Sequence, residues 1–139
     1  MDGPSEWISS LVTETKKDGS LRLCIDPRPL DKALLRCHYT MPIVDDFLPD
    51  LAQAKVFSIL DLKSGFWQVA LDEQSSNLTT MGTLLRLFRI RRLRFGITPA
   101  PELFQRKLGE VLAHLAGVKA VVDDTLVYEK GDTIEAADR

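Results

Sequence analysis

The sequence VKAVVDDTLVY (residues 118–128) contains an adjacent pair of aspartates with apolar and β-branched residues on both sides. This pattern predicts two short strands around the pair. A second β-rich run, KVFSILDL (residues 55–62), carries another aspartate, Asp61, near its end. Acidic groups in apolar strands are costly to bury without partners, and a divalent metal removes that cost. Carboxylates from separate strand ends can hold the metal ions that support phosphoryl transfer.

The acidic pair also has a simpler explanation. Aspartate is a common turn residue, so Asp123 and Asp124 could serve only to close a hairpin. The residues by themselves leave the metal site and the plain turn as open alternatives.

The other patterns interleave strands and helices. Residues 16–20 place an Asp-Gly pair between two apolar runs, which is typical of a β-hairpin over 11–26. Residues 102–115 keep apolar positions on one helical side. Similar patterns predict a short helix over 42–54, strands over 55–62 and 66–71, a hairpin or pair of strands over 78–95 and a helix that begins near Asp132. Hairpin-linked strands mixed with helices predict an α+β fold.

The charge is unevenly distributed along the 139 residues. A net charge of −2 argues against a nucleic-acid-binding protein, which usually has a basic excess. Yet residues 86–94 contain five arginines, and a local basic patch can steer a polyanion. This stretch either follows a phosphate backbone or forms a solvated strand face, and the sequence leaves both open.

The two cysteines, Cys24 and Cys37, lack a Cys-x-x-Cys spacing. This favours a reducing, intracellular compartment, cytoplasmic or nuclear, and argues against secretion. The sequence contains neither an apolar signal core nor an apolar run of about 18 residues, so no membrane span is expected. Four other conspicuous side chains are not interpreted as catalytic. His38 and His114 are interpreted as surface or structural histidines, and Trp7 and Trp67 as packing residues. Trp67 is also a weaker candidate for a nucleotide pocket.

Four segments, in their order along the chain, resemble the reverse transcriptase domain of long-terminal-repeat retrotransposons of the Ty3/gypsy type. They are KKDGSLRLCIDPRPLDKA (16–33), YTMPIVDDFLPDLAQAKVFSILDLKSGFWQVAL (39–71), RFGITPAPELFQRKLGEVL (94–112) and VKAVVDDTLVY (118–128). The resemblance implies a fingers and palm fragment that ends before the thumb. It assigns about 1–42 and 72–95 to the fingers, and about 43–71 and 96–139 to the palm.

The resemblance also implies roles for single residues. Asp61 matches the first metal-binding aspartate of the family, and Asp123 and Asp124 match the pair of its YxDD box. Phe66 matches the aromatic residue that excludes the 2′-hydroxyl of an incoming sugar. The remaining matches are Lys16, Lys17 and Arg22 in a fingers hairpin that clamps the triphosphate, Ser64 and Gly65 with backbone amides facing that triphosphate, Phe95 and Gly96 under the templating base pair, and Asp26 and Arg28 near the template.

The sequence departs from the family pattern at three places. Val121 stands where many members have tyrosine, and Arg94 replaces the proline of a Pro-Phe-Gly segment. Leu84, Leu85 and Arg86 replace a glycine-containing turn. These departures bear on local geometry more than on the metal ligands.

The resemblance implies an RNA-directed DNA polymerase that uses two Mg²⁺ ions, with Mn²⁺ as a substitute. The expected partners are an RNA or DNA template, a primer strand, a dNTP, and the remainder of a pol polyprotein with its thumb and ribonuclease H. The alternative is a catalytically inactive relic or domesticated fragment that acts as a binding module.

Overall fold

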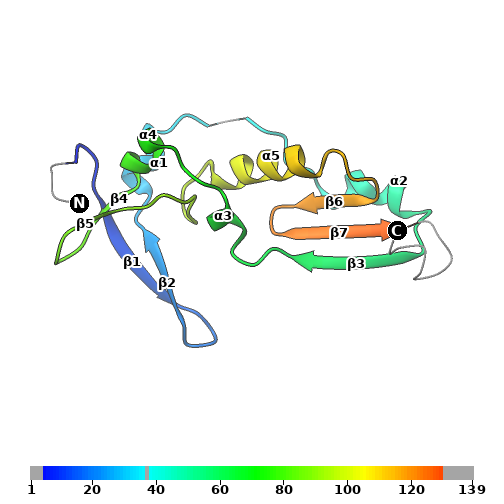
Figure 1. The fold of residues 1–139 in the computed structure, drawn as a ribbon, viewed down its shortest axis with the longest axis horizontal. Helices are drawn as coiled ribbons and strands as arrows, with labels where there is room; N and C mark the ends of the chain where they lie inside the picture. Colours follow the sequence, from blue (N-terminus) through cyan, green and yellow to red (C-terminus); the bar gives the residue numbers. More distant parts are fainter. Residues whose placement is uncertain (1–4, 37, 130–139) are drawn as a thin grey trace. The chain divides into compact units, whose positions relative to one another are not determined.

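The computed structural model describes residues 5–36 and 38–129 (Figure 1). The chain divides into two compact units, each built from two separate stretches of sequence. The first unit comprises Met1–Cys37 and Phe66–Ala100, and the second comprises His38–Gly65 and Pro101–Arg139. These boundaries lie close to those predicted for fingers and palm, and the naming of the two units as fingers and palm stays a prediction.

The first unit contains a four-stranded sheet in the order β2-β1-β4-β5. Its strands are β1 (Ser9–Thr15), β2 (Leu21–Ile25), β4 (Thr80–Gly82) and β5 (Leu87–Arg89). β1 and β2 form the predicted hairpin, in which the Lys16 amide donates to the Ser20 carbonyl at 2.8 Å. Gly19 has a φ of 80°, a conformation that favours glycine. The Asp-Gly signal therefore predicted this hairpin correctly, and β4–β5 confirms the second one.

Three short helices complete the first unit's stretches: α1 (Arg28–Ala33), α3 (Gly65–Gln68) and α4 (Glu73–Leu78). The predicted strand over 66–71 is wrong, because α3 occupies its first half and only Ala70 makes an isolated bridge. The Phe66 ring is 4% exposed and packs on Phe95, so burial of the ring outweighs local strand preference. The unpredicted α4 is capped by Asp72, whose carboxylate accepts from the Ser75 amide at 2.7 Å.

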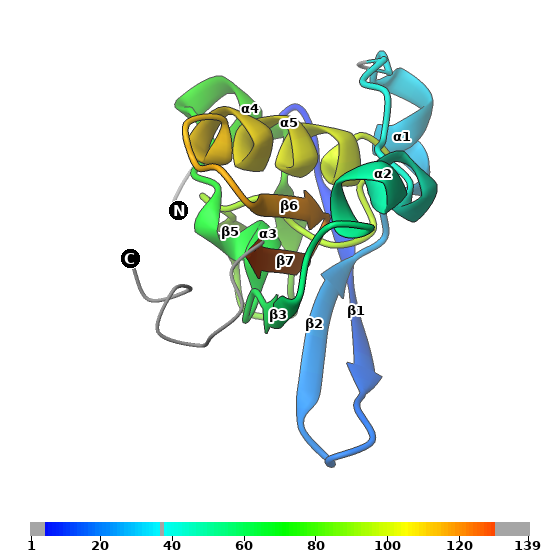
Figure 2. The same cartoon turned by 90° about the vertical axis from the view of Figure 1, so that its right-hand side faces the viewer.

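The second unit contains an antiparallel sheet in the order β3-β7-β6, with helix α5 running alongside β6 (Figures 1 and 2). The elements are β3 (Val56–Asp61), β6 (Val118–Val121), β7 (Asp124–Glu129) and α5 (Ala100–Leu112). They confirm the predicted strands around the acidic pair, the strand before Asp61 and the long helix. The predicted helix over 42–54 is a 3₁₀ turn, η1 (Val44–Phe47), followed by α2 (Leu48–Leu51).

Strand β3 lies at the edge of its sheet and carries exposed apolar side chains. Phe57, Ile59 and Leu60 are 50%, 74% and 54% exposed. Such a group on an edge strand is an association risk. The helix predicted from Asp132 lies outside the described residues.

Helices mixed with mainly antiparallel sheets confirm the predicted α+β fold. In the part of the chain that the structure describes, no helix has the length and apolar character needed to cross a membrane.

Candidate active site

Three aspartates meet at one end of the second unit's sheet. Asp61, the last residue of β3, is the register partner of Asp124, the first residue of β7. Residues directly opposite in an antiparallel pair have Cβ atoms about 5 Å apart on the same face. Asp123 precedes Asp124 in the β6–β7 turn, and its carbonyl accepts from the Leu62 amide at 2.8 Å. Sequence order thus brings an acid from β3 beside the acidic pair.

The β6–β7 turn is held by Gln105 of α5. The Val122 amide donates to Gln105 Oε1 at 2.6 Å, and Gln105 Nε2 donates to the Ala120 carbonyl at 2.8 Å. Val122 has a φ of 53°, which is unfavourable for a β-branched residue. Gln105 is only 4% exposed, so the two hydrogen bonds are partly shielded from water. Gln105 was not predicted from the sequence, where its signal is a polar residue next to Phe104 in the apolar pattern of the helix.

The electrostatics of the turn disfavour a bare carboxylate at Asp123. Burial raises the pKa of Asp123, and the charges of Asp61 and then Asp124 raise it further. Its Oδ1 atom is buried and has no hydrogen-bond partner among the described residues. A divalent cation would satisfy this oxygen and offset the repulsion, so the donor set fits such an ion.

The carboxylates of the three aspartates do not point toward a common position for an ion. Within residues 5–36 and 38–129, no group of three or more Asp, Glu, His or Cys side chains is placed to hold a metal. Binding an ion therefore requires the carboxylates to turn toward one another.

Gly65 fits closely behind the aspartates. A Cβ atom at this position would lie 2.5 Å from Asp123 Oδ1 and 2.8 Å from Phe104 Cζ, so no larger residue fits without rearrangement. The preceding Ser64 has a φ of 56°. The Gly65 amide donates to the Leu62 carbonyl at 3.1 Å. That amide thus has a partner within the chain, and its predicted contact with a triphosphate stays a prediction.

In the first unit, three of the predicted nucleotide-site residues form a row of contacts. The Phe66 and Phe95 ring centroids are 4.5 Å apart, with the ring planes inclined at 46°. The Arg22 guanidinium carbon lies 5.2 Å from the Phe95 centroid. Arg22 also lines a cavity of about 410 Å³ with Lys16 and Lys17. Through Arg22, the structure therefore connects the predicted clamp residues to Phe95 and Phe66.

The two predicted template residues form an ion pair with each other. Arg28 Nη2 lies 2.6 Å from Asp26 Oδ2. Hydrogen bonds from the Arg28 side chain and backbone lower the pKa of Asp26 to about 2. Gly96, with a φ of 95°, lies beside Pro27, so a Cβ there would be 3.6 Å from the proline Cγ.

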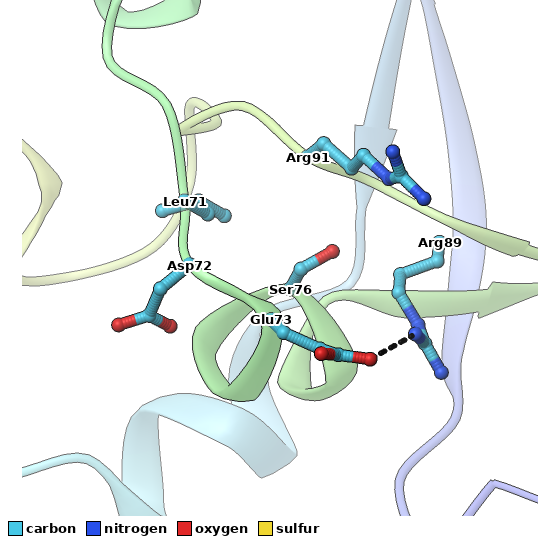
Figure 3. Close-up of a pocket in the computed structure, with 6 residues that line it drawn as sticks. All are labelled: Leu71, Asp72, Glu73, Ser76, Arg89 and Arg91. Atoms are coloured by element: carbon cyan, nitrogen blue, oxygen red, sulfur yellow. Dashed lines mark ion pairs between the residues drawn. The ribbon is translucent and has the colours of Figure 1, made fainter.

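Most of the arginine-rich stretch makes contacts within the first unit. Arg89 and Arg91 line a cavity of about 310 Å³ together with Asp72 and Glu73 (Figure 3). Arg89 lies 4.0 Å from Glu73, an ion pair at the limit of contact. Arg86 lies over the Phe88 ring, and Arg92 donates to the Gln68 carbonyl. Arg94 is buried. These contacts favour a structural role over a continuous phosphate-binding track.

The fold is similar to that of part of a solved viral protein. The chain superposes on the foamy viral protease-reverse transcriptase with a TM-score of 0.81 and 23% identity. The match covers 94% of this chain and 23% of the foamy viral chain.

Residues 15–137 match the family described as Reverse transcriptase (RNA-dependent DNA polymerase). The chain therefore belongs to the reverse transcriptase family.

Relatives of known name agree with the Ty3/gypsy resemblance. The Pol polyprotein from the Drosophila melanogaster transposon 412 is 46% identical over 110 residues, which are 75% of this chain and 9% of that protein. The Pol polyprotein of the Drosophila transposon gypsy is 31% identical over 134 residues, 95% of this chain and 13% of its own length. An "RNA-directed DNA polymerase homolog" from Oenothera berteroana is 40% identical over 111 residues, covering 78% of each chain. The chain thus spans a small part of the polyproteins and most of the plant relative.

Proposed function

We propose that this chain carries the nucleotidyl-transfer site of an RNA-directed DNA polymerase. The observation that supports this most strongly is the register of β3 and β7, which sets Asp61 opposite Asp124 and beside Asp123. In the proposed reaction, the 3′-oxygen of a primer attacks the α-phosphate of a dNTP. A phosphodiester bond forms, and pyrophosphate leaves.

Members of the family generally use divalent metal ions. Here Asp61 and Asp123 would hold two Mg²⁺ ions, with Asp124 assisting and Mn²⁺ as a substitute. When bound, such ions would stabilise charge on the attacking and leaving oxygens. The unpartnered Oδ1 of Asp123 and its raised pKa support this assignment, because both point to a missing positive charge.

The contribution of the chain itself is to position the reacting groups. Gln105 fixes the turn that carries Asp123, and Gly65 leaves room for the Asp123 side chain. Phe66 would exclude the 2′-hydroxyl of a ribonucleotide. Arg22 would bind the triphosphate, because a guanidinium forks onto phosphate oxygens.

The remaining site residues and partners follow the same proposal. Lys16 and Lys17 would assist Arg22 at the triphosphate, and Asp26 and Arg28 would lie near the template. The foamy viral enzymes of similar fold were solved with double-stranded DNA and with an RNA/DNA hybrid, which supports a primed template as the partner. The remainder of a pol polyprotein is a further proposed partner, since the transposon relatives are such polyproteins. An intracellular location remains a prediction from the cysteines.

Metal binding can be tested on this chain directly. Paramagnetic Mn²⁺ should broaden the NMR signals of Asp61, Asp123 and Asp124 before others, and Asp123→Asn should weaken that effect. Asp45→Asn, at an exposed position in η1, is the matched control and should leave Mn²⁺ binding unchanged. If Asp123→Asn leaves the broadening by Mn²⁺ unchanged, the metal assignment is wrong.

The reaction is tested in a polymerase that includes the flanking pol sequence. Asp123→Asn should abolish primer extension while the protein stays folded, and Asp45→Asn should extend normally. Near-normal extension by Asp123→Asn would contradict the proposed function. No specific observation favours the alternative of an inactive binding module.

A further inference from the structure

Arg94 is a charged side chain in the interior of the first unit. It is 6% exposed, and burial lowers the pKa of its guanidinium. Its Nη1 donates to the Leu23 carbonyl at 2.9 Å, and its guanidinium carbon lies 3.9 Å from the Trp67 ring centroid. A buried charge is costly unless it is well partnered, and a guanidinium over an indole face at this distance is a strong cation–π contact.

Arg94 therefore joins two separate parts of the first unit. Leu23 belongs to β2, the second strand of the hairpin, whereas Trp67 belongs to α3. The proline that the family pattern has at position 94 has no side-chain donor or charge and could make neither contact. The departure noted in the sequence thus coincides with an added connection between β2 and α3.

A second row of contacts runs next to the first. Arg22 lies over the Phe95 ring, and Phe95 packs on Phe66. Each member of this row is a sequence neighbour of a member of the Arg94 row: Arg22 precedes Leu23, Phe95 follows Arg94, and Phe66 precedes Trp67. Because neighbours share a backbone, any shift of Leu23 relative to Trp67 also moves Arg22 relative to Phe66.

We propose that Arg94 is a positioning residue for nucleotide selection, fixing the distance between Arg22 on the hairpin and Phe66 on α3. This inference rests on the proposed function, in which Arg22 binds the triphosphate and Phe66 screens the sugar. Arg94 itself touches no nucleotide. It acts through Leu23 and Trp67, and its effect is on the affinity and sugar selectivity of nucleotide binding.

The test compares four single variants and one double variant of the chain. Arg94→Gln removes the charge and the planar fork, and Trp67→Leu removes the ring. Trp67→Phe keeps an aromatic face and serves as the conservative variant. Arg91→Gln is the matched control, because Arg91 is exposed on the same segment and loses the same charge. Thermal unfolding first identifies a temperature at which every variant is folded.

Two measurements follow at that temperature. Hydrogen exchange reports how firmly β2 is held, and calorimetric titration with dTTP or ribothymidine triphosphate, which differ only in the 2′-hydroxyl, reports affinity and sugar selectivity in the presence of Mg²⁺. We expect Arg94→Gln to speed exchange across Leu21–Ile25 and to weaken dTTP binding, each roughly tenfold. The preference for dTTP over ribothymidine triphosphate should fall as well. Trp67→Phe should behave almost as the wild type.

The double variant Arg94→Gln/Trp67→Leu should bind dTTP no more weakly than the worse single variant, because both changes break the same contact. Additive losses would show that the two side chains act separately and would overturn the proposal. So would unchanged exchange in Arg94→Gln, or faster exchange with unchanged dTTP affinity and selectivity. If Arg91→Gln weakens binding equally, general charge is responsible and the proposal is wrong. If the wild type binds no dTTP, the proposed function fails at its nucleotide site, and exchange still decides whether Arg94 holds the hairpin.

Discussion

The substitution Gln105→Leu tests whether Gln105 stabilises the β6–β7 turn that carries Asp123. It removes the hydrogen bonds to the Val122 amide and the Ala120 carbonyl and leaves both backbone groups without their partner. Leaving a buried backbone group without its partner costs about 1–3 kcal/mol, and because both hydrogen bonds are part-buried, each loss is taken as about 1.5 kcal/mol. The two bonds together give an expected loss of about 3 kcal/mol in the free energy of unfolding.

Thermal unfolding followed by circular dichroism measures this loss. For a chain of this size, about 3 kcal/mol lowers the midpoint by roughly 6–12 °C. Mn²⁺ affinity should fall too, because the turn that carries Asp123 is no longer fixed. Gln74→Leu is the matched control: Gln74 is exposed on α4, and its change should stay within about 0.5 kcal/mol. A midpoint for Gln105→Leu within about 1 °C of the wild type, or unchanged Mn²⁺ affinity, would refute this reasoning.

Three further predictions concern other parts of the chain. In an active polymerase, Phe66→Ala should raise ribonucleotide incorporation relative to deoxynucleotide incorporation; an unchanged ratio would leave Phe66 as a packing residue. Arg28→Ala should raise the pKa of Asp26 from about 2 toward 3.8 in an NMR titration. Because the folded-state pKa is the lower one, the pair's stabilisation is present above pH 3.8 and is lost as the pH falls through 2, so the variant should lose less stability on acidification. The 139-residue chain alone should extend a primed RNA template weakly or not at all. It should also self-associate in size-exclusion chromatography, because Phe57 and Ile59 are exposed on an edge strand. A clean monomer with template-dependent synthesis would contradict this prediction.

Local signals account for what the sequence predicted well. The Asp-Gly pair predicted the β1–β2 hairpin correctly, because the turn residues and the apolar runs on both sides lie within a few positions of one another. The strands around Asp123 were predictable for the same reason. That Asp61 joins them required the family resemblance, since pairing between β3 and β7 is long-range.

Other features depend on contacts that no local pattern records. Gln105 is a plain helical glutamine in the sequence, and its role arises only when α5 lies beside the turn. Residues 66–71 have strand-like composition, but the Phe66 ring is buried against Phe95 and the first half of the segment becomes helical. The sequence left the stretch that contains Arg94 open between a phosphate-binding run and a solvated strand face, whereas Arg94 is buried and contacts Leu23 and Trp67.

The division of each unit into two stretches has a consequence for synthesis on the ribosome. Asp61 and its partner Asp124 are 63 positions apart in the sequence. At about 5–20 residues per second, translation separates their emergence by about 3–13 s. During that interval β3 has no partner from β7, and its apolar residues are available to chaperones or to other nascent chains. The first unit is likewise interrupted by the second, so a truncation after Gly65 leaves both units incomplete. Expression of this domain should therefore depend on slow, chaperone-assisted completion more than on the stability of either half.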